Sequence, residues 1–390
     1  MSQQKMLFVI QGGSEWMGGL HYVKNLIKTV KSTGGQVAVD LLVYAPDQVS
    51  LFADMSADID SIHVYNDMVA AAGLPRRAWW WLQRKLGNSL HPALDNFIRA
   101  QGYQFAYPCL PRKDFKYYRF ADWIPDFQYR HYPEGSNPVE IQGRKDQNSF
   151  VTANAPLIYL SSQHALRDCE ELFPASKGKL AVMQFCVYAD PLHFPDPLEE
   201  VRSAYNIPRK YFMVSNLLAP TKNLEVVIAA LGMLKKKGLS VPVVVSGDIH
   251  DYRNPGFKHT IFQRISAENV REEVIMLGLM PRIRQKQLLA NALAIVQPSR
   301  FEGWNTLVEE AKWMGKEIVL SDIPVHLEQA PELATYFKDN DAADLAAKLE
   351  AIYHNAADKP AITAVAVSPA YQQNIARFAK HFMDTSLGAG

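Results

Sequence analysis

Two carboxylates beside a predicted helix start are the clearest chemical signal in the chain. Residues 299–315, SRFEGWNTLVEEAKWMG, follow a short apolar run and a Gln-Pro-Ser turn, which is typical of a buried strand leading through a loop into a helix. Glu302 lies in the loop and Glu310 about one turn into the helix. Asn305 or Thr306 can cap this helix, and its free backbone amides suit a phosphate, whereas carboxylates suit sugar hydroxyls. The stretch therefore predicts a site able to hold a sugar nucleotide.

Two other loops offer groups that suit a phosphate. Lys222 lies in the sequence APTKN between a predicted strand and a predicted helix, where its ammonium could offset the charge of a diphosphate or simply be an exposed surface group. Residues 12–19, GGSEWMGG, form a glycine-rich loop between a strand and a helix that is expected from about Leu20. Such a loop serves either phosphate approach or a tight turn, and the residues alone leave both open.

Alternating short apolar runs and helical patterns position these loops. The alternation is typical of parallel sheets covered by helices on both faces, and 390 residues exceed what one hydrophobic core usually supports. The proline-rich residues 190–197 are the best linker between two such domains, and the alternation restarts after them. Strands are expected near residues 6–11, 36–43, 61–65, 119–125, 157–161 and 180–187 in the first domain, and near 211–214, 241–246, 274–277, 294–296 and 317–320 in the second.

Composition excludes several classes of protein. The chain has 41 basic and 40 acidic residues, so its net charge of +1 gives no general attraction to nucleic acid or membrane. Three cysteines without CxxC spacing argue against a disulfide framework or a thiolate metal site and favour a reducing compartment. The N-terminal sequence does not have the pattern of a signal peptide, and no apolar stretch is long enough to span a bilayer. We therefore expect a cytoplasmic protein with at most peripheral membrane attachment.

One segment departs from this neutral composition. Residues 75–86, PRRAWWWLQRKL, combine four basic side chains with three consecutive tryptophans, a mixture that suits the headgroup layer of an anionic membrane. The alternative is a helix whose tryptophans pack inward while its charges stay in water. A second basic and aromatic stretch, residues 112–119, could join the same surface. Stacking on nucleic-acid bases is improbable in a near-neutral chain without a nucleic-acid motif.

Another cluster of polar residues follows the predicted strand at residues 119–125. Asp126 and His131 lie just beyond the expected end of this strand, where open α/β sheets bind ligands. Each could serve as an acid, a base or a ligand of sugar hydroxyls, or have only a structural role.

Taken together, these motifs resemble the family 4 retaining glycosyltransferases of the GT-B fold. Glu302 and Glu310 match the E-x7-E motif of that family, residues 215–223 (SNLLAPTKN) are similar to its phosphate loop, and Gly278 resembles its nucleobase turn. Gly18 and Gly19 resemble its N-terminal loop, and the sequence WIPD, which ends at Asp126, resembles its acceptor-side loop.

The resemblance implies a fold of two doubly wound Rossmann-like α/β domains facing a cleft. Residues 1–190 would form the acceptor-side domain and residues 205–367 the nucleotide-sugar domain. A helix in residues 368–390 would pack back on the first domain.

By the same resemblance, Glu310 would bind the nucleotide ribose and Lys222 would neutralise the leaving diphosphate. Glu302 would face the sugar and the diphosphate together with the backbone of Asn305, Thr306 and Leu307. Two positions depart from the family pattern. An arginine is often found where this chain has Asn216 or Leu217, and a His-Asp pair where it has Pro125 and Asp126, which leaves Asp126 as the match on the acceptor side.

The implied activity is transfer of a sugar, with retention, from a nucleotide-diphosphate sugar to a glycan or lipid-linked acceptor, in the biosynthesis of a polysaccharide or glycoconjugate. No cofactor is expected, and no metal, because lysine and the helix dipole can supply the positive charge. An anionic membrane surface is a further expected partner, and nucleic acid is not. The alternatives are a nucleotide-sugar epimerase or a phosphorylase of the same fold, and a non-catalytic sugar-nucleotide-binding protein. A phosphorylase would need a lysine-bound pyridoxal phosphate, for which no site is visible.

Overall fold

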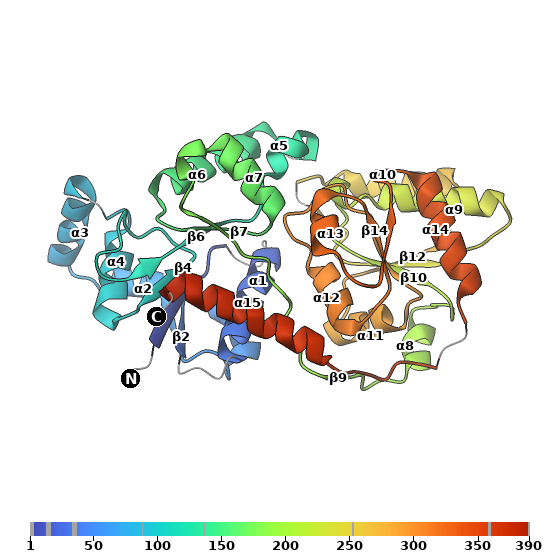
Figure 1. Cartoon of the computed structure of the whole chain (residues 1–390), viewed down its shortest axis with the longest axis horizontal. Coiled ribbons are helices and arrows are strands. Elements are labelled where there is room, and N and C mark those ends of the chain that lie inside the picture. Colours follow the sequence, from blue (N-terminus) through green and yellow to red (C-terminus); the bar gives the residue numbers. More distant parts are fainter. Residues whose placement is uncertain are drawn as a thin grey trace. The chain divides into compact units, whose positions relative to one another are not determined.

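The computed structural model divides into two compact units, which are described separately (Figure 1). It describes residues 4–12, 17–32, 37–87, 89–135, 137–251, 253–357 and 360–388. The first unit comprises Met1–Phe127, Gly143–Tyr188 and Gln372–Gly390, and the second comprises Gln128–Gln142 and Ala189–Tyr371. A short piece of the N-terminal half of the chain therefore belongs to the second unit.

The first unit is built on two parallel sheets. The five-stranded sheet has the order β3-β2-β1-β4-β5 and the three-stranded sheet the order β6-β7-β8. Their strands are β1 (Gln4–Val9), β2 (Val37–Val43), β3 (Ser61–Val64), β4 (Phe105–Tyr107), β5 (Arg119–Phe120), β6 (Asp122–Ile124), β7 (Ile158–Leu160) and β8 (Leu180–Val182). Every residue of β2 is buried, as expected for a parallel strand covered on both faces.

The single strand predicted at residues 119–125 is wrong, because the chain changes sheets there. The amide of Ala121 donates to the carbonyl of Ala106 in the larger sheet, at 3.3 Å. The amide of Asp122 donates instead to Leu157, at 3.1 Å, beside the smaller sheet. One apolar run thus supplies β5 to one sheet and β6 to the other.

Helices surround these sheets, and the last of them closes the core of the first unit. They are α1 (Met17–Ser32), η2 (Pro46–Met55), α2 (Tyr65–Ala70), α3 (Leu74–Leu86), α4 (Pro92–Gln101), α6 (Pro138–Asn154), α7 (Gln163–Leu172), η4 (Pro174–Ser176) and α15 (Pro369–Leu387). Phe382 of α15 is fully buried, and its ring lies 6.3 Å from that of Phe8 and 5.9 Å from that of Phe105. The C-terminal helix therefore belongs to the aromatic core of this unit from Gln372 onward.

The second unit contains one six-stranded sheet with the order β12-β11-β10-β13-β14-β15, and its adjacent strands are parallel. The strands are β10 (Phe212–Ser215), β11 (Val243–Ser246), β12 (Val274–Gly278), β13 (Ile295–Gln297), β14 (Ile318–Ser321) and β15 (Ala334–Phe337). In sequence order this is the 3-2-1-4-5-6 arrangement of a dinucleotide-binding fold. Its direction of winding reverses between β10 and β13.

Helical segments make up much of the rest of the second unit. They are α5 (Gln128–His131), η3 (Pro133–Gly135), α8 (Leu198–Ala204), η5 (Pro220–Lys222), α9 (Leu224–Lys236), α10 (Phe257–Ala267), α11 (Arg282–Asn291), α12 (Thr306–Met314), α13 (Pro324–Gln329) and α14 (Ala342–Asn355). Apolar residues of α9, α10 and α14 form one buried cluster with the strands, and those of α8, α11 and α12 form another. A short antiparallel pair, β9 (Leu192–His193) and β16 (Ala364–Val365), lies outside the sheet.

Two expectations about the first unit change with the structure. Helix α1 begins at Met17, so Gly18 and Gly19 lie in its first turn and not in the preceding loop, whose residues 13–16 fall outside the described part of the chain. The tryptophan segment forms α3, but its tryptophans do not pack into a core, since no residue of this helix is buried. Within the described residues, no helix is long and apolar enough to cross a membrane.

Candidate functional site

The candidate site of the second unit begins where the winding of its sheet reverses. Asn216 directly follows β10, and Gln297 ends β13. Their side-chain amides bond to each other in both directions, at 2.8 Å from Asn216 to Gln297 and at 3.2 Å in return. Open α/β sheets bind their ligands at this edge. Asn216, which stands where the resembled family often has an arginine, therefore contacts a neutral amide.

Glu302 lies at the centre of a buried hydrogen-bond network. Four donors converge on its Oε1: Lys222 Nζ at 2.6 Å, Ser299 Oγ at 2.7 Å, Asn305 Nδ2 at 2.9 Å and Gln297 Nε2 at 3.1 Å. Among the described residues, none of the hydrogen bonds of this carboxylate goes to Oε2. One oxygen is thus held by the protein, and the other can accept a hydrogen bond from a ligand.

Charge explains why this buried carboxylate stays ionised. Burial by itself would raise the pKa of Glu302, but the Lys222 ammonium, aided by the Ser299 hydroxyl, brings that pKa below its usual value. The Lys222 side chain remains about one quarter exposed, at 26%. An ammonium has three N–H donors, and Glu302 accepts only one of them. Lys222 can therefore bind a diphosphate without releasing Glu302.

Backbone contacts hold Lys222 in place. It ends the short helix η5, and Asn223 turns the chain into α9 with a left-handed φ of 51°. Asparagine tolerates this conformation better than most residues. The amide of Arg300 donates to the carbonyl of Thr221 at 2.9 Å, so the loops that carry Lys222 and Glu302 are joined directly.

Helix α12 begins beside the hydrogen-bond network of Glu302, and two backbone amides lie at its start. Of the two predicted candidates, Asn305 is its N-cap and Thr306 is not, and the Asn305 side chain accepts from the amide of Val308 at 3.1 Å. The amide of Asn305 is committed to Gln329 at 3.2 Å, contrary to the expectation that it would face a ligand. Thr306 and Leu307 occupy the first helical positions, where an amide has no carbonyl of its own helix to bond. These two amides fit the expected phosphate contacts.

Glu310 is buried one turn further along α12. It forms an ion pair with Arg282, whose side chain comes from α11 and is about half exposed. The sequence did not reveal this partner, because 28 residues separate the two and an exposed arginine has no local signature. A ribose bound to Glu310 would share this carboxylate with the guanidinium or replace it.

Glycines shape the carboxyl edge of the sheet. A Cβ on Gly247 would lie 2.0 Å from the carbonyl oxygen of Asn216, and the residue has a φ of 129°, so the backbone there has room only for glycine. Gly278 has a φ of 67°, and a Cβ on it would meet nothing within 4 Å. Gly278 thus combines a turn that favours glycine with open space, as a backbone contact to a nucleobase requires.

The remaining predicted site residues lie in the first unit. Asp126 follows β6, and its carboxylate is 3.8 Å from the guanidinium of Arg144. Gly18 and Gly19 lie at the amino end of α1. The structure therefore brings Lys222, Glu302 and Asn305 together around one oxygen atom, while Asp126 and the two glycines belong to a different unit.

Residues from the N-terminal half of the chain support the Glu302 loop. The His131 ring stacks on that of Phe301 with centroids 5.5 Å apart, and Arg300 donates to the Tyr132 hydroxyl at 3.1 Å. Both contacts lie within the second unit, because residues 128–142 belong to it. His131 thus contacts the residue next to Glu302, a position that its sequence context did not indicate.

His326 is a further buried group that the sequence did not single out. Its Nδ1 lies 2.9 Å from the carbonyl of Ser321, and its Nε2 has no hydrogen-bond partner among the described residues. The Nδ1–H therefore donates to Ser321, and the ring is neutral. Burial lowers the pKa of His326 to about 4, and this effect outweighs the nearby Glu302 carboxylate, which acts in the opposite direction.

The ion pair at the centre of the site can be tested by a double-mutant cycle. Lys222→Met leaves a buried carboxylate without its counter-ion, so we expect a clear loss of stability. Glu302→Gln removes the negative charge with which Lys222 pairs. The loss of stability in the double variant should therefore be smaller than the sum of the losses in the two single variants. We expect a coupling free energy of about 1–3 kcal/mol from urea unfolding. Additive losses of stability would show that the ion pair between Lys222 and Glu302 does not hold together the loops that carry these residues.

The buried histidine predicts a pH dependence of stability. Unfolded histidine binds a proton near pH 6.5, whereas folded His326 resists protonation until about pH 4. Protons therefore favour unfolding, and the stability present above pH 6.5 should be lost progressively as the pH falls toward 4, by up to about 3 kcal/mol. His326→Asn keeps a donor near Nδ1 and should reduce this acid-dependent loss in urea titrations. An unchanged pH profile would mean that the folded ring takes up a proton readily.

Comparisons with known proteins find a family model and solved structures that resemble this chain. Residues 199–364 match the family described as Glycosyl transferases group 1. The chain is similar to the crystal structure of Anabaena HepE in complex with UDP and glucose, at 14% identity over 98% of this chain and 95% of that one, with a TM-score of 0.60. It is also similar to sucrose-phosphate synthase from Thermosynechococcus elongatus, at 14% identity over 98% and 95% of the two chains, with a TM-score of 0.62.

A third similar structure is WaaG, a glycosyltransferase involved in lipopolysaccharide biosynthesis, at 13% identity over 97% of this chain and 95% of that one, with a TM-score of 0.55. No protein with a curated function matches the chain by sequence. At these identities the solved structures show the fold alone, and the family match covers the unit that contains Lys222, Glu302 and Glu310. The chain thus has the fold of the GT-B glycosyltransferases, and its residues 199–364 match the model of the glycosyl transferases group 1 family.

Proposed function

We propose that the protein is a retaining glycosyltransferase of the hexosyltransferase type. It would move a sugar from a nucleotide-diphosphate sugar to a glycan or lipid-linked acceptor in the biosynthesis of a polysaccharide or glycoconjugate. We place this activity in the cytoplasm, at the inner face of a membrane. The observation that carries the proposal is the Glu302 carboxylate, whose Oε1 is held by Lys222 at 2.6 Å and by Asn305, the N-cap of α12, at 2.9 Å.

The donor is proposed from the polar groups along the carboxyl edge of the sheet. Glu310 would bind the ribose hydroxyls, and the backbone at Gly278 would approach the nucleobase. Lys222 and the amides of Thr306 and Leu307 would bind the diphosphate. A nucleotide sugar is also supported by the structure of HepE, which was determined with UDP and glucose. The choice of base is left open, because a backbone contact can serve several bases.

The proposed reaction needs no protein nucleophile. The bond between the anomeric carbon and the diphosphate breaks, and the acceptor hydroxyl forms its new bond to that carbon on the same face of the sugar. The acceptor proton passes to an oxygen of the departing diphosphate. Glu302 Oε2 would accept a hydrogen bond from the donor sugar, and Asp126 would contact the acceptor. The residues then act by positioning both substrates and stabilising charge that develops on the leaving group.

We also propose that Lys222 and the amino end of α12 supply the positive charge that the diphosphate requires. A helix N-terminus contributes roughly half of an elementary charge, and the ammonium contributes a full one. Asn216 adds none, because its side chain is a neutral amide, which bonds to the amide of Gln297. No resident metal and no organic cofactor enter this proposal.

A substitution of Glu310 tests the donor assignment. Glu310→Gln keeps the shape of the side chain but removes the charge that strengthens its bonds to ribose hydroxyls. We expect the KM for the preferred nucleotide sugar to rise on the order of 10- to 100-fold, because a hydrogen bond to a charged group contributes about 1.5–3 kcal/mol. Release of nucleoside diphosphate, measured over UDP, GDP, dTDP and ADP sugars, is the assay. Glu272→Gln, at an exposed position, is the matched control.

Other outcomes of that assay would contradict the proposal. Release of the nucleoside diphosphate together with an epimerised sugar, without any acceptor, would identify an epimerase. Binding of donors without turnover in the presence of candidate acceptors would indicate a non-catalytic nucleotide-sugar-binding protein. An unchanged KM in Glu310→Gln would remove the ribose role of this residue.

A further inference from the structure

Helix α3 (Leu74–Leu86) is exposed along its whole length and projects from the first unit (Figure 1). None of its residues is buried, although its sequence includes three leucines and three tryptophans. Leu74 and Leu86 are 81% and 78% exposed, and Trp81 and Trp79 are 62% and 55% exposed. A surface helix normally turns such side chains toward a core. The exposed apolar side chains of α3 therefore mark an interaction surface.

Polar contacts define the inward face of α3. Arg77 donates to the carbonyl of Val69 at 2.8 Å, and Gln83 accepts from Asn96 of α4 at 2.9 Å. Trp80, midway between these two residues, is half-buried. The spacing of three residues places Arg77, Trp80 and Gln83 on one side of the helix. The side that faces the protein is thus largely polar.

The opposite face carries an apolar stripe. Leu74, Ala78, Leu82 and Leu86 recur at intervals of four residues, and all four are exposed. At 100° per residue this stripe lies opposite the inward face, because Leu82 falls about 160° from Trp80. Trp79 and Trp81 flank it on either side. The helix is amphipathic, but its apolar face points to solvent.

Charge completes the description of this surface. Arg76, Arg84 and Lys85 are exposed, and the helix contains no acidic residue. Long basic side chains can extend past an apolar surface and keep their charged ends in water or among anionic groups. The next helix adds another cation, since the exposed Arg99 stacks on the ring of Tyr117 at 3.8 Å.

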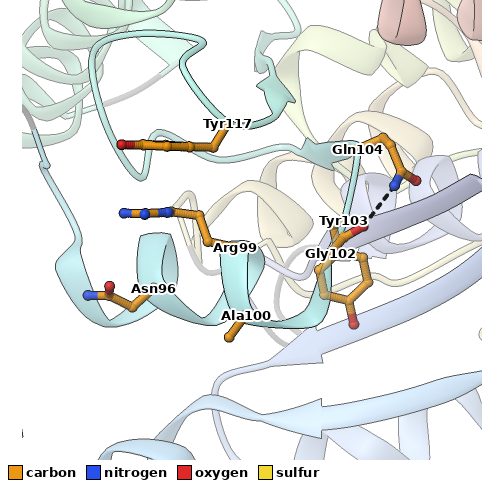
Figure 2. A pocket seen from close by; sticks show the side chains of 7 residues that line it. All are labelled: Asn96, Arg99, Ala100, Gly102, Tyr103, Gln104 and Tyr117. Atoms are coloured by element: carbon orange, nitrogen blue, oxygen red, sulfur yellow. Dashed lines mark hydrogen bonds between the residues drawn. The ribbon is translucent and has the colours of Figure 1, made fainter.

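The Arg99 and Tyr117 pair borders a cavity of about 620 Å³, which is lined by α4 and the segments after it (Figure 2). Asn96 lines this cavity and also donates to Gln83 of α3. The cavity shares no residue with the network around Glu302, which lies in the other unit. It therefore belongs to the cationic and aromatic surroundings of α3 and not to the donor site.

From this arrangement we propose that α3 lies in the headgroup layer of an anionic lipid bilayer, with its leucine stripe toward the acyl chains. Tryptophans are favoured at the boundary between headgroups and acyl chains, and basic side chains pair with anionic lipids. A nucleic acid could pair its phosphates with the cations, but it would leave the leucine stripe exposed to water. The inference deepens the proposed use of a lipid-linked acceptor and rests on that function only for its purpose, since bilayer binding needs no nucleotide sugar.

Co-sedimentation with vesicles tests the proposal on the full chain. We expect binding to vesicles of phosphatidylcholine with phosphatidylglycerol at low salt, and much weaker binding to phosphatidylcholine alone. Leu82→Glu with Leu86→Glu places charge in the stripe and should abolish binding. The triple variant Arg76→Gln, Arg84→Gln, Lys85→Gln should weaken binding on the order of 100-fold, because each cation near an anionic surface contributes about fivefold. The matched control is Lys236→Gln, Arg271→Gln, Lys380→Gln, at exposed positions on other elements, and should bind nearly as the wild type.

Fluorescence reports the depth of insertion. Tryptophan emission of the wild type should shift to shorter wavelength on anionic vesicles, whereas Trp79→Phe with Trp81→Phe should still bind with a smaller shift. All changes are at exposed positions, so far-UV circular dichroism and nucleoside diphosphate release should remain as in the wild type. Equal binding by the stripe variant, or equal loss in the control triple variant, would overturn the proposal. Self-association through α3 without lipid, or binding to RNA in place of vesicles, would also overturn it. Failure of nucleotide-sugar turnover with intact vesicle binding would count against the proposed function alone.

Discussion

The buried ion pair between Lys222 and Glu302 is the interaction on which the donor site depends. A carboxylate taken out of water is costly unless it is paired and hydrogen-bonded, and here a lysine and three neutral donors meet one oxygen. These four hydrogen bonds occupy Oε1 of Glu302 and keep the carboxylate ionised. They also fix the direction in which Oε2 points. The same contact holds the ammonium of Lys222, which ends η5 just before α9. A single electrostatic contact thus fixes both groups that we propose for the sugar and the diphosphate.

The architecture around this pair explains how distant segments reach it. The sheet reverses its winding between β10 and β13, and ligands of open α/β sheets bind at the carboxyl edge of such a point. Gly247 permits close approach to the carbonyl of Asn216, and the contact between Arg300 and Thr221 joins the two loops. His131 and Tyr132 then support residues 300 and 301 from outside. The geometry of the site therefore depends on four stretches of chain.

Much of the fold could be predicted from local patterns, and the parts that could not be predicted depend on long-range partners. Apolar periodicity indicated five of the six strands of the large sheet in the second unit and missed β15. Residue types at the start of α12 narrowed its cap to Asn305 or Thr306. The pairing of Lys222 with Glu302 spans 80 residues and that of Glu310 with Arg282 spans 28, so no local signal specifies either partner. The split between β5 and β6 was missed for the same reason. The amide of Ala121 bonds to one sheet, and the amide of Asp122 bonds to Leu157, which is distant in the sequence. The tryptophan helix was recognised from composition, but the direction of its apolar face required the contacts of Arg77 and Gln83.

We propose above all that Lys222, held by Glu302, binds the diphosphate of a nucleotide sugar. The most direct measurement is the change in melting temperature that UDP, GDP, dTDP or ADP produces in the wild type and in Lys222→Met, each compared with the matching monophosphate. At a concentration about a hundredfold above Kd, a ligand specific for the folded state adds about 2.7 kcal/mol, which corresponds to a shift of several degrees. We expect such a shift in the melting temperature of the wild type with at least one nucleoside diphosphate, and a smaller shift with the matching monophosphate. In Lys222→Met, the shifts with diphosphate and monophosphate should be equal. No shift with any diphosphate, or a diphosphate shift in Lys222→Met as large as in the wild type, would contradict this proposal.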